Sequence, residues 1–535
     1  MESMKNSFTV TVLLFCTIIL PCQAQPGGSS STYTLSGAYS LNGGSATQTG
    51  QTYTSSTTDQ SAIYVLNSGS LTLTDCTIST TGNSSSNDNS SFYGLNAAVL
   101  ATSGSKITMS GCKVNTTGTG ANGIFAYGTG NITSTGDNLT MTGGGGHAIM
   151  CSGGGTITVT NDTAVTSGSS SSNIATDRGG GTITVNGGSY TSNGSNSAAI
   201  YSTGSITCTN ATLVATGAEA LVIEGSNSIT LNNCTVKSTY NKWGSLLYQS
   251  MSGDAAGVDG YLTMTGGSFT YTGKAGGMFY NTNSTATYVL GGVTLNNSCD
   301  TLIRCIKGSW GGSSASSGGI TYFTATNQVL SGLIHVDASS RAHIALQGGS
   351  SFTGAMNNSN TADTMTLVMD ANSRWIVTKT SHLTSVANSA GIAGMTVTNI
   401  TGNGNDVYYK PAAPVNSYLS GKTYTLVNGG YLLPEGSSGV EGAISALPTD
   451  WNLQQNYPNP FNPNTTIGYQ ITTAGYITLK VYDVLGKEVS VLVNGYKQAG
   501  SYQASFDARN IPSGIYMYQL TCPYGVQSKK MILIK

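Results

Sequence analysis

The chain has 535 residues, a formal net charge of −1, and charged side chains make up only 8% of it. With no long basic run, this composition excludes a partner bound mainly through charge, such as nucleic acid or an anionic membrane surface. Glycine is abundant, at 71 residues, but apolar residues recur in register along the chain, which low-complexity disorder does not require.

The N-terminus has the pattern of an export signal. Lys5 precedes an apolar run over residues 8–20, and Cys-Gln-Ala at 22–24 supplies a cleavage site. We therefore expect residues 1–24 to be a signal peptide. A lipoprotein signal through Cys22 is a poorer alternative, because Leu20 and Pro21 are bulky where small residues are expected. No later stretch is long and apolar enough for a membrane-spanning helix.

Residues 25–60 are rich in Ser, Thr and Gly and are expected to form an N-terminal cap or an irregular lead-in. From residue 61 to residue 433 a short phrase returns, as in LTLTDCTI at 71–78, ITLNNCTV at 229–236 and LTMTGGSF at 262–269. Its apolar or small residues stand at the first, third, sixth and eighth positions. The period of two indicates strands, and the central Asx/Gly pair shifts the alternation by one residue. Two short strands should therefore meet at a corner and bury the same side.

The copies mostly recur every 23 to 26 residues, and a third apolar strand precedes each phrase. This spacing predicts an all-β fold, a parallel β-helix with three strands per coil, for which a right-handed winding is expected. About twelve coils stacked ~4.8 Å apart would make a rod on the order of 55–60 Å long. In particular, Leu231 and Met264 should lie in adjacent layers of one core.

Removal of the signal leaves eight cysteines. Cys76, Cys112 and Cys234 share one position of the phrase, so we interpret them as small, buried, core-facing residues. A disulfide between Cys76 and Cys112 in neighbouring coils is an alternative. Because there is no CxxC pair, no zinc site is expected, nor any other metal ion or cofactor.

Residues 434–450 read as a linker, and the composition changes from Trp451 onward. Short strands and turns over 451–535 predict a small β-sandwich. The motifs of this tail are NYPNPFNP at 456–463, VYDVLGKEV at 481–489, IPSGIYMYQL at 511–520 and KKMILIK at the end. They closely resemble the type A C-terminal sorting domain of the type IX secretion system.

This resemblance implies a Gram-negative source similar to the Bacteroidetes and a secreted or outer-surface location. It also implies that residues 451–535 engage the type IX secretion machinery. The solenoid resembles, more loosely, the bacterial β-helix repeat proteins that are adhesin-like.

Outward-facing side chains decide the function of such a fold, and the first outward row is threonine. At the second position of the phrase the row comprises Thr72, Thr108, Thr133, Thr158, Thr184, Thr207, Thr230 and Thr263. A second row two residues further on is interrupted by Ser110, Asn186 and Asn232. Flat Thr-x-Thr arrays resemble the faces of ice-binding β-solenoids. The simpler interpretation is that Thr suits a solvated strand.

The second outward row is aromatic and follows the apolar residue of the third strand. It consists of Tyr64, Phe125, Tyr201, Tyr248 and Tyr280. If exposed, these rings would suit sugar rings or a surface protein as ligand. Two alternatives stay open: the strand parity is reversed, or a flanking loop covers the row.

Catalytic signals are weak. The densest polar stretch lies between Gly217 and Gly260, with Glu219, Glu224, Lys237, Lys242, Asp254 and Asp259. A polysaccharide lyase or hydrolase would need carboxylates that converge there, such as Glu224 and Asp254. Asp254 and Asp259 stand in a Gly-rich insertion typical of a solvated loop, and Asp177-Arg178 reads as an isolated turn pair.

The leading prediction is therefore an exported, adhesin-like β-helix that binds a ligand or serves as a structural module and has no catalytic residues. The alternatives are a polysaccharide-active enzyme and an ice-binding solenoid.

Overall fold

A computed structural model describes residues 33–310, 318–436, 451–473, 475–497 and 500–535. The expected signal peptide and most of the expected linker lie outside these residues. The chain forms two compact units, residues 1–435 and 436–535.

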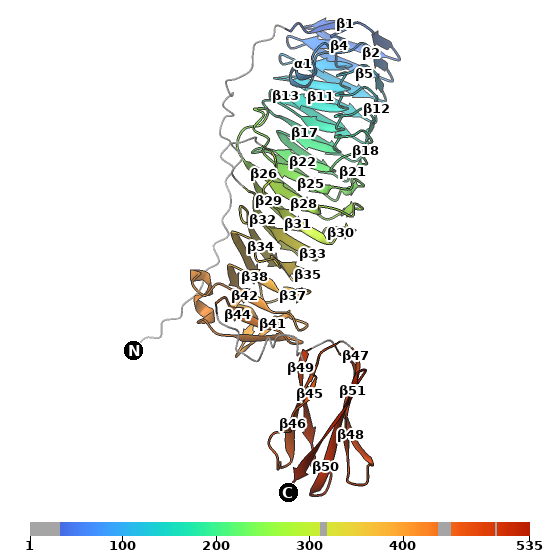
Figure 1. Cartoon of the computed structure of the whole chain (residues 1–535). Helices are drawn as coiled ribbons and strands as arrows, with labels where there is room; N and C mark the ends of the chain where they lie inside the picture. Colours follow the sequence, from blue (N-terminus) through green and yellow to red (C-terminus); the bar gives the residue numbers. More distant parts are fainter. Residues whose placement is uncertain (1–32, 311–317, 437–450, 474, 498–499) are drawn as a thin grey trace, which may run out of the picture. The chain divides into compact units, whose positions relative to one another are not determined.

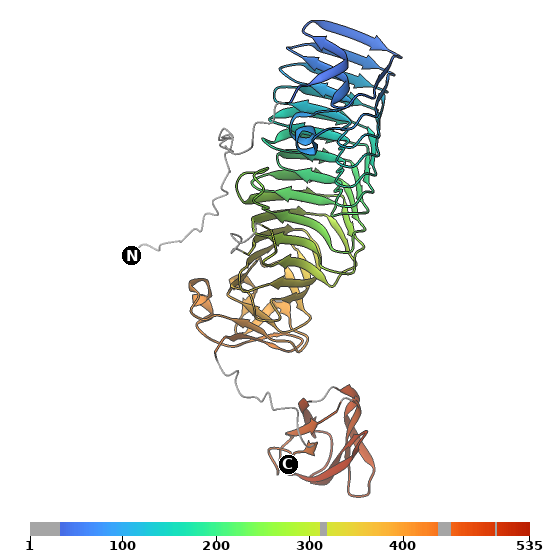
Figure 2. The ribbon, with the colours of Figure 1, turned by 45° about the horizontal axis from the view of Figure 1, so that its top comes forward.

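The first unit is a parallel β-solenoid of about 16 turns, built from three sheets (Figures 1 and 2). Its first coil shows the plan: β1 (Ser36–Asn42), β2 (Ser45–Thr49) and β3 (Thr52–Ser55) start sheets A, B and C. In the next coil β4 (Gln60–Leu66), β5 (Ser70–Thr74) and β6 (Thr77–Thr80) pair in parallel with them. The predicted parallel β-helix with three strands per coil is therefore confirmed.

Sheet A is the largest of the three sheets. After β4 it continues through β7 (Val99–Ala101), β10 (Ile124–Tyr127), β13 (Ile149–Ser152), β16 (Ile174–Thr176), β19 (Ile200–Ser202), β22 (Leu221–Glu224), β25 (Trp243–Tyr248), β28 (Gly277–Thr282) and β31 (Thr301–Cys305). Sheet B ends at β39 (Ser385–Ala387) and sheet C at β30 (Thr294–Asn297).

The core follows the predicted register. Leu231 on β23 (Ser228–Asn232) is the direct partner of Met264 on β26 (Asp259–Thr265), and both are buried. Cys76, Cys112 and Cys234 are buried free thiols, so no disulfide joins the first two. Each coil buries its apolar side only against its neighbours, so the stability of the solenoid is a sum of contacts between adjacent coils.

The corner between the two strands of each repeat is formed by a residue with a left-handed backbone conformation. Asp75, Asn161 and Asn233 have φ of 53°, 56° and 58°, and glycine takes the same place in coils such as those of Gly111 and Gly266. Only Gly, Asn and Asp adopt this conformation readily. The Asx/Gly residue is therefore required by the backbone, which turns from sheet B to sheet C at this point.

The N-terminal boundary differs from expectation. Residues 36–55, expected within a cap or irregular lead-in, form a complete coil in register with the next one. Short polar strands such as SATQT lack the apolar residues that mark the later copies, which is why the pattern did not reveal them. Among the described residues, none of the helices has the length and apolar character needed to cross a membrane.

Sheet A has a second apolar layer on its outer face. Inward residues such as Ile124, Ile200 and Phe279 belong to the main core. Two smaller clusters lie outside it, one around Phe125 and one around Tyr280. Insertions between the coils cover these clusters, and the largest of them contains α1 (Asn87–Tyr93), which Figure 1 shows against the N-terminal coils.

The second unit is a β-sandwich. Its three-stranded sheet contains β45 (Asn452–Leu453), β46 (Asn464–Ile471) and β49 (Gly500–Asp507). Its four-stranded sheet contains β47 (Gly475–Tyr482), β48 (Glu488–Lys497), β50 (Gly514–Cys522) and β51 (Gly525–Leu533). The strand pairings are antiparallel and the two sheets share one hydrophobic core, as the sequence predicts.

Candidate binding pocket

A pocket of about 310 Å³ lies on the solenoid beside α1. Three parts of the chain line it: α1, the turns of three successive coils, and two acidic side chains from further along. The lining residues are Asn87, Asp88, Ser91, Phe92, Thr119, Gly144, Gly145, Ser169, Ser170, Asp177 and Asp254. Its wall is thus mainly hydroxyl, amide and carboxylate, with one aromatic ring.

The helix α1 is held in place at both ends. The Ser86 side chain accepts a hydrogen bond from the Asn89 backbone amide at 3.2 Å, which caps the first turn. Gly94 ends the helix with φ of 77°, and a Cβ there would come within 2.8 Å of the Phe125 ring. Glycine is therefore needed both for the turn and for the close approach of α1 to sheet A. The Ser152 hydroxyl also donates to the Phe92 carbonyl at 2.6 Å.

A second insertion reaches the pocket from the opposite direction. Residues 249–257, which we call the strap, lie between β25 and β26. The Gln249 side chain closes the strap on itself by donating to the carbonyls of Ala255 and Gly257 at 3.0 and 2.5 Å. At its tip, Asp254 pairs with Arg178 over 3.4 Å. The strap thus contacts a coil that precedes its own by several coils.

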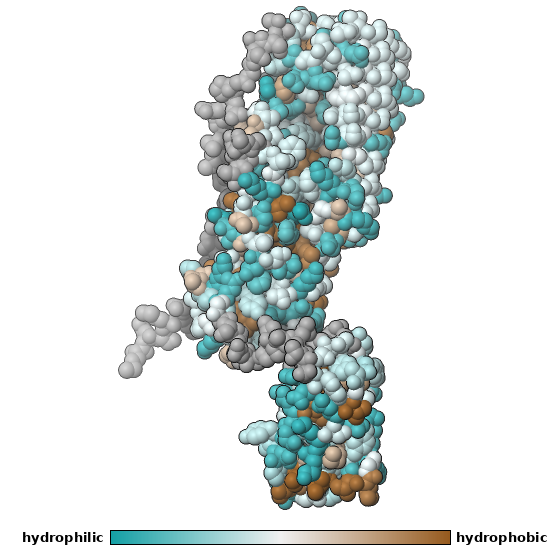
Figure 3. Space-filling view, in the orientation of Figure 1, coloured by the Kyte–Doolittle hydropathy of each residue, from teal (hydrophilic) through white to brown (hydrophobic). Residues whose placement is uncertain are grey.

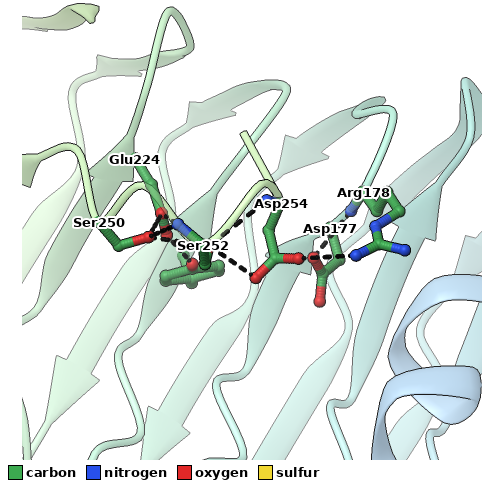
Figure 4. A network of polar contacts seen from close by, with 7 residues as sticks. Asp177, Arg178, Glu224, Ser250, Ser252 and Asp254 are labelled. Atoms are coloured by element: carbon green, nitrogen blue, oxygen red, sulfur yellow. Dashed lines mark hydrogen bonds and ion pairs between the residues drawn. The ribbon is translucent and has the colours of Figure 1, made fainter. Parts of the chain in front are cut away.

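Arg178 joins the two insertions. Its guanidinium carbon lies 3.9 Å from the centre of the Phe92 ring, a cation–π contact with α1. The same guanidinium forms the ion pair with Asp254 of the strap. Figure 4 shows Asp254 and Arg178 directed toward each other, with Asp177 beside them.

Glu224 anchors the base of the strap. Its side chain is almost fully buried, with 2% exposed. Its carboxylate accepts hydrogen bonds from the hydroxyls of Tyr201, Tyr248 (2.9 Å) and Ser250. The Ser252 hydroxyl lies 2.9 Å from an Asp254 carboxylate oxygen, to which it donates, and 3.4 Å from one of Glu224, so it stands between the two carboxylates (Figure 4). Burial, followed by nearby acidic groups, raises the pKa of both tyrosines, which stay protonated and can donate to Glu224.

Asp177 is the most perturbed acid of the pocket. Burial, reinforced by the negative charges of Asp254 and Glu224, raises the pKa of Asp177 to about 7, although Arg178 opposes the shift. The Arg178 backbone amide donates to one carboxylate oxygen at 2.7 Å. Near neutral pH this group therefore exists both as an acid and as a carboxylate. Among the described residues no group of three or more His, Cys, Asp or Glu side chains could hold a metal ion.

The aromatic row has the predicted parity but is not an exposed stripe. Phe125, Tyr248 and Tyr280 are only 0%, 8% and 3% exposed, and Tyr64 and Tyr201 are partly buried. Tyr280 stacks on Trp243, and Tyr248 contacts Trp310. The alternative of a flanking cover is the one the structure adopts, because large rings outside the main core still lose contact with water when insertions pack on them.

The prediction for Asp177 and Arg178 is also corrected. They are not an isolated turn pair, and Asp254 is not in a detached solvated loop, because the strap brings 254 to 178. Glu224 and Asp254 meet through Ser252, as the enzyme alternative requires, whereas Asp259 is exposed on β26 and takes no part. The sequence patterns did not predict the pocket residues of α1. The insertion at 83–93 could have indicated them, because Ser86 can cap a short helix there.

The threonine row stands in register on sheet B. One threonine from each successive coil pairs with the next, in the order Thr47, Thr72, Thr108, Thr133, Thr158, Thr184, Thr207, Thr230 and Thr263. The face of the solenoid seen in Figure 3 is largely pale over its N-terminal coils, in keeping with their many Thr, Ser and Gly residues. Ice binding by sheet B stays a prediction. A measurement of thermal hysteresis with the purified chain would test it.

The C-terminal unit shows how its motifs are used. Tyr518 accepts a hydrogen bond from the Asn456 backbone amide at 2.9 Å and donates to the Gln454 carbonyl at 2.8 Å. The turn after VYDV is closed by Asp483, whose side chain accepts from the amides of Leu485 and Lys487. The sequence motifs of the tail thus supply packing residues and turn residues of one β-sandwich.

Residues 455–535 match the family described as the secretion system C-terminal sorting domain. The resemblance of the tail is confirmed, and the sorting domain indicates a secreted or cell-surface protein of a Bacteroidetes-type bacterium. It also implies an interaction with the type IX secretion machinery. No curated protein and no solved structure matches the chain.

Proposed function

We propose that this exported β-solenoid is an adhesin-like protein that binds a glycan in the pocket between α1 and the strap. The observation that carries the proposal is the meeting of two insertions, from distant coils, at Arg178 around a polar, partly enclosed space. Covering the outer apolar clusters accounts for α1 but not for the contact of Arg178 with both insertions beside a polar space.

The lining supports a sugar more than an apolar ligand. Ser91, Thr119, Ser169 and Ser170 offer hydroxyl groups, and Asn87 offers an amide. These groups can donate and accept hydrogen bonds, as sugar hydroxyls do. A site of this kind holds its ligand with a few convergent polar groups. The aromatic row then has a supporting role, because Tyr201 and Tyr248 hold the carboxylate that anchors the strap.

A glycan array with a matched pair of variants tests the proposal. Ser169→Trp places a bulky ring in the pocket, and Ser189→Trp places the same ring on the exposed face of sheet C. We expect the first variant to lose the array signals of the wild type and the second to keep them. Equal signals from both variants would remove the pocket from consideration.

Hydrolysis of the bound glycan is a second candidate. It is favoured by Asp177, whose pKa of about 7 suits a general acid, with the second carboxylate of Asp254 beside it. In this case Asp177→Asn would keep the binding of neutral glycans and abolish the release of reducing sugar. Release of sugar at the wild-type rate by Asp177→Asn would contradict an acid role for this residue.

A further inference from the structure

The charged side chains that line the pocket are all acidic. Three carboxylates line it, from Asp88, Asp177 and Asp254, and its described lining includes no Lys, Arg or His. The nearest cation, Arg178, is already paired with Asp254 and lies against the Phe92 ring. Its charge is therefore largely balanced before any ligand enters.

Asp177 also has an unused acceptor. Within the described part of the chain, its carboxylate receives a hydrogen bond only from the Arg178 backbone amide, on one of its two oxygens. Asp177 is half-buried and lines the pocket, so a donor on a ligand in the pocket can reach this carboxylate. A donor that also carries positive charge would satisfy both the hydrogen-bonding and the electrostatic deficit.

We propose that the pocket selects glycans that carry a protonated amine, such as oligosaccharides of 2-amino sugars, with the ammonium group seated between Asp177 and Asp254. This inference rests on the proposed glycan-binding function and names the substrate class of the same site. An ammonium group has three donors and no acceptor, which matches a wall of carboxylate oxygens. Acidic sugars would instead meet like charge, and N-acetylated sugars would lack the cation.

The protonation state of Asp177 makes the proposal measurable. The charged and titratable groups around it are Arg178 on the same turn, Glu224 on β22, Asp254 on the strap and Tyr201 on β19, and Asp88 lies across the pocket on α1. A cation that binds beside Asp177 favours the carboxylate and lowers its pKa from about 7. At pH 6, where Asp177 is mostly protonated and a sugar amine is charged, binding should therefore release up to about one proton.

The experiment is calorimetry of the full exported chain at pH 6 in two buffers that differ in ionisation enthalpy. The probes are a glucosamine trisaccharide with free amines, its fully N-acetylated form, and a glucuronic acid trisaccharide. We expect the amine form to bind at least about ten-fold more tightly than the other two and to release a proton. Asp177→Asn should abolish the proton release and weaken binding of the amine form about ten-fold. Asp259→Asn, which removes an exposed carboxylate outside the pocket, should change neither.

The possible outcomes separate the two proposals. If the N-acetylated or acidic trisaccharide binds as tightly as the amine form, the selectivity is wrong while glycan binding stands. If Asp177→Asn leaves affinity and proton release unchanged, the placement of the ammonium is wrong. If none of the three binds, the inference is wrong, and the glycan array with Ser169→Trp decides separately whether the pocket binds another glycan.

Discussion

Arg178 lies with its guanidinium carbon 3.9 Å from the centre of the Phe92 ring, although 86 positions separate the two residues in the chain. The same guanidinium pairs with Asp254 of the strap. One side chain thus joins the two insertions that shape the pocket, and its removal should loosen both at once.

Arg178→Ala should leave the solenoid folded but free α1 and the strap. The ion pair is partly exposed and the ring contact is single, so we expect a loss of about 1 kcal/mol in the free energy of unfolding. Hydrogen exchange should rise in residues 87–93 and 249–257 and stay unchanged in the strands of sheet B. Arg178→Lys is the matched control for charge, and protection of both segments in Arg178→Ala would contradict the role of this residue.

Glu224→Ala should destabilise the chain more than loss of any single one of its tyrosine partners. The substitution leaves the buried hydroxyls of Tyr201 and Tyr248 without their acceptor, which costs roughly 1–3 kcal/mol per unsatisfied group. Urea unfolding of Glu224→Ala and of Tyr201→Phe measures the difference. Two variants of equal stability would show that the carboxylate is not the centre of the network.

The pH dependence of stability should carry the signature of raised acid pKa values. Burial raises the pKa of Asp177 to about 7 and that of Asp162 to about 6. In the folded state these groups hold their protons over a range in which the unfolded chain has lost them. Their contribution to stability is therefore full below about pH 4 and is lost as the pH rises to about 7.

Asp177→Asn should reduce the fall of the unfolding free energy with pH between pH 4 and 7 by about 1 kcal/mol per pH unit, because one fewer group then binds a proton in the folded state only. The free energy of unfolding from urea titrations at several pH values is the measurement. Asp259→Asn serves as the control, since its carboxylate is exposed. A slope unchanged in Asp177→Asn would show that its pKa is ordinary.

Asn233→Ala should test the corner of the coil. Asn233 has φ of 58°, a conformation that costs most residues about 1–2 kcal/mol. We expect Ala to destabilise the solenoid by about 1 kcal/mol, whereas Asn233→Gly should be tolerated because neighbouring coils use glycine at this position. A thermal unfolding midpoint that is equal for Ala and Gly would contradict the requirement for a left-handed residue.

Removal of residues 451–535 should leave a folded solenoid that is not exported across the outer membrane. The sorting domain and the solenoid have separate hydrophobic cores, so the solenoid core is complete without the tail. Cell fractionation with an antibody against the solenoid compares the truncated chain with the wild type. An equal amount of both chains outside the cell would show that the tail is not the export address.

The coil was predictable because its determinants are local and repeated. A residue such as Leu231 buries its side chain against the same position of the next coil, so the sequence period records the spatial neighbour directly. The left-handed corner is equally local, since backbone sterics restrict it to Asx or Gly. The tail was recognisable for a different reason, because its motifs occur in a fixed order over a short stretch.

The pocket was not predictable in this way. Asp177 and Arg178 looked isolated because their partners, Phe92 and Asp254, come from insertions that do not repeat. No sequence period links these residues, and only the folded coils bring them together. The burial of the aromatic row has the same origin: strand parity predicted that Tyr248 and Tyr280 point away from the main core, but not that insertions would cover them.

The amino-acid sequence by itself thus determined the three-stranded parallel coil, the buried side of each strand and the sorting domain, because each depends on residues that are close in the chain or one period apart. Only the tertiary structure decided where the two insertions meet, which carboxylates converge, and how far Asp177 is removed from water. The physical reason is that burial and electrostatic coupling depend on distance in space, and irregular insertions can reach any of several coils without leaving a regular trace in the sequence.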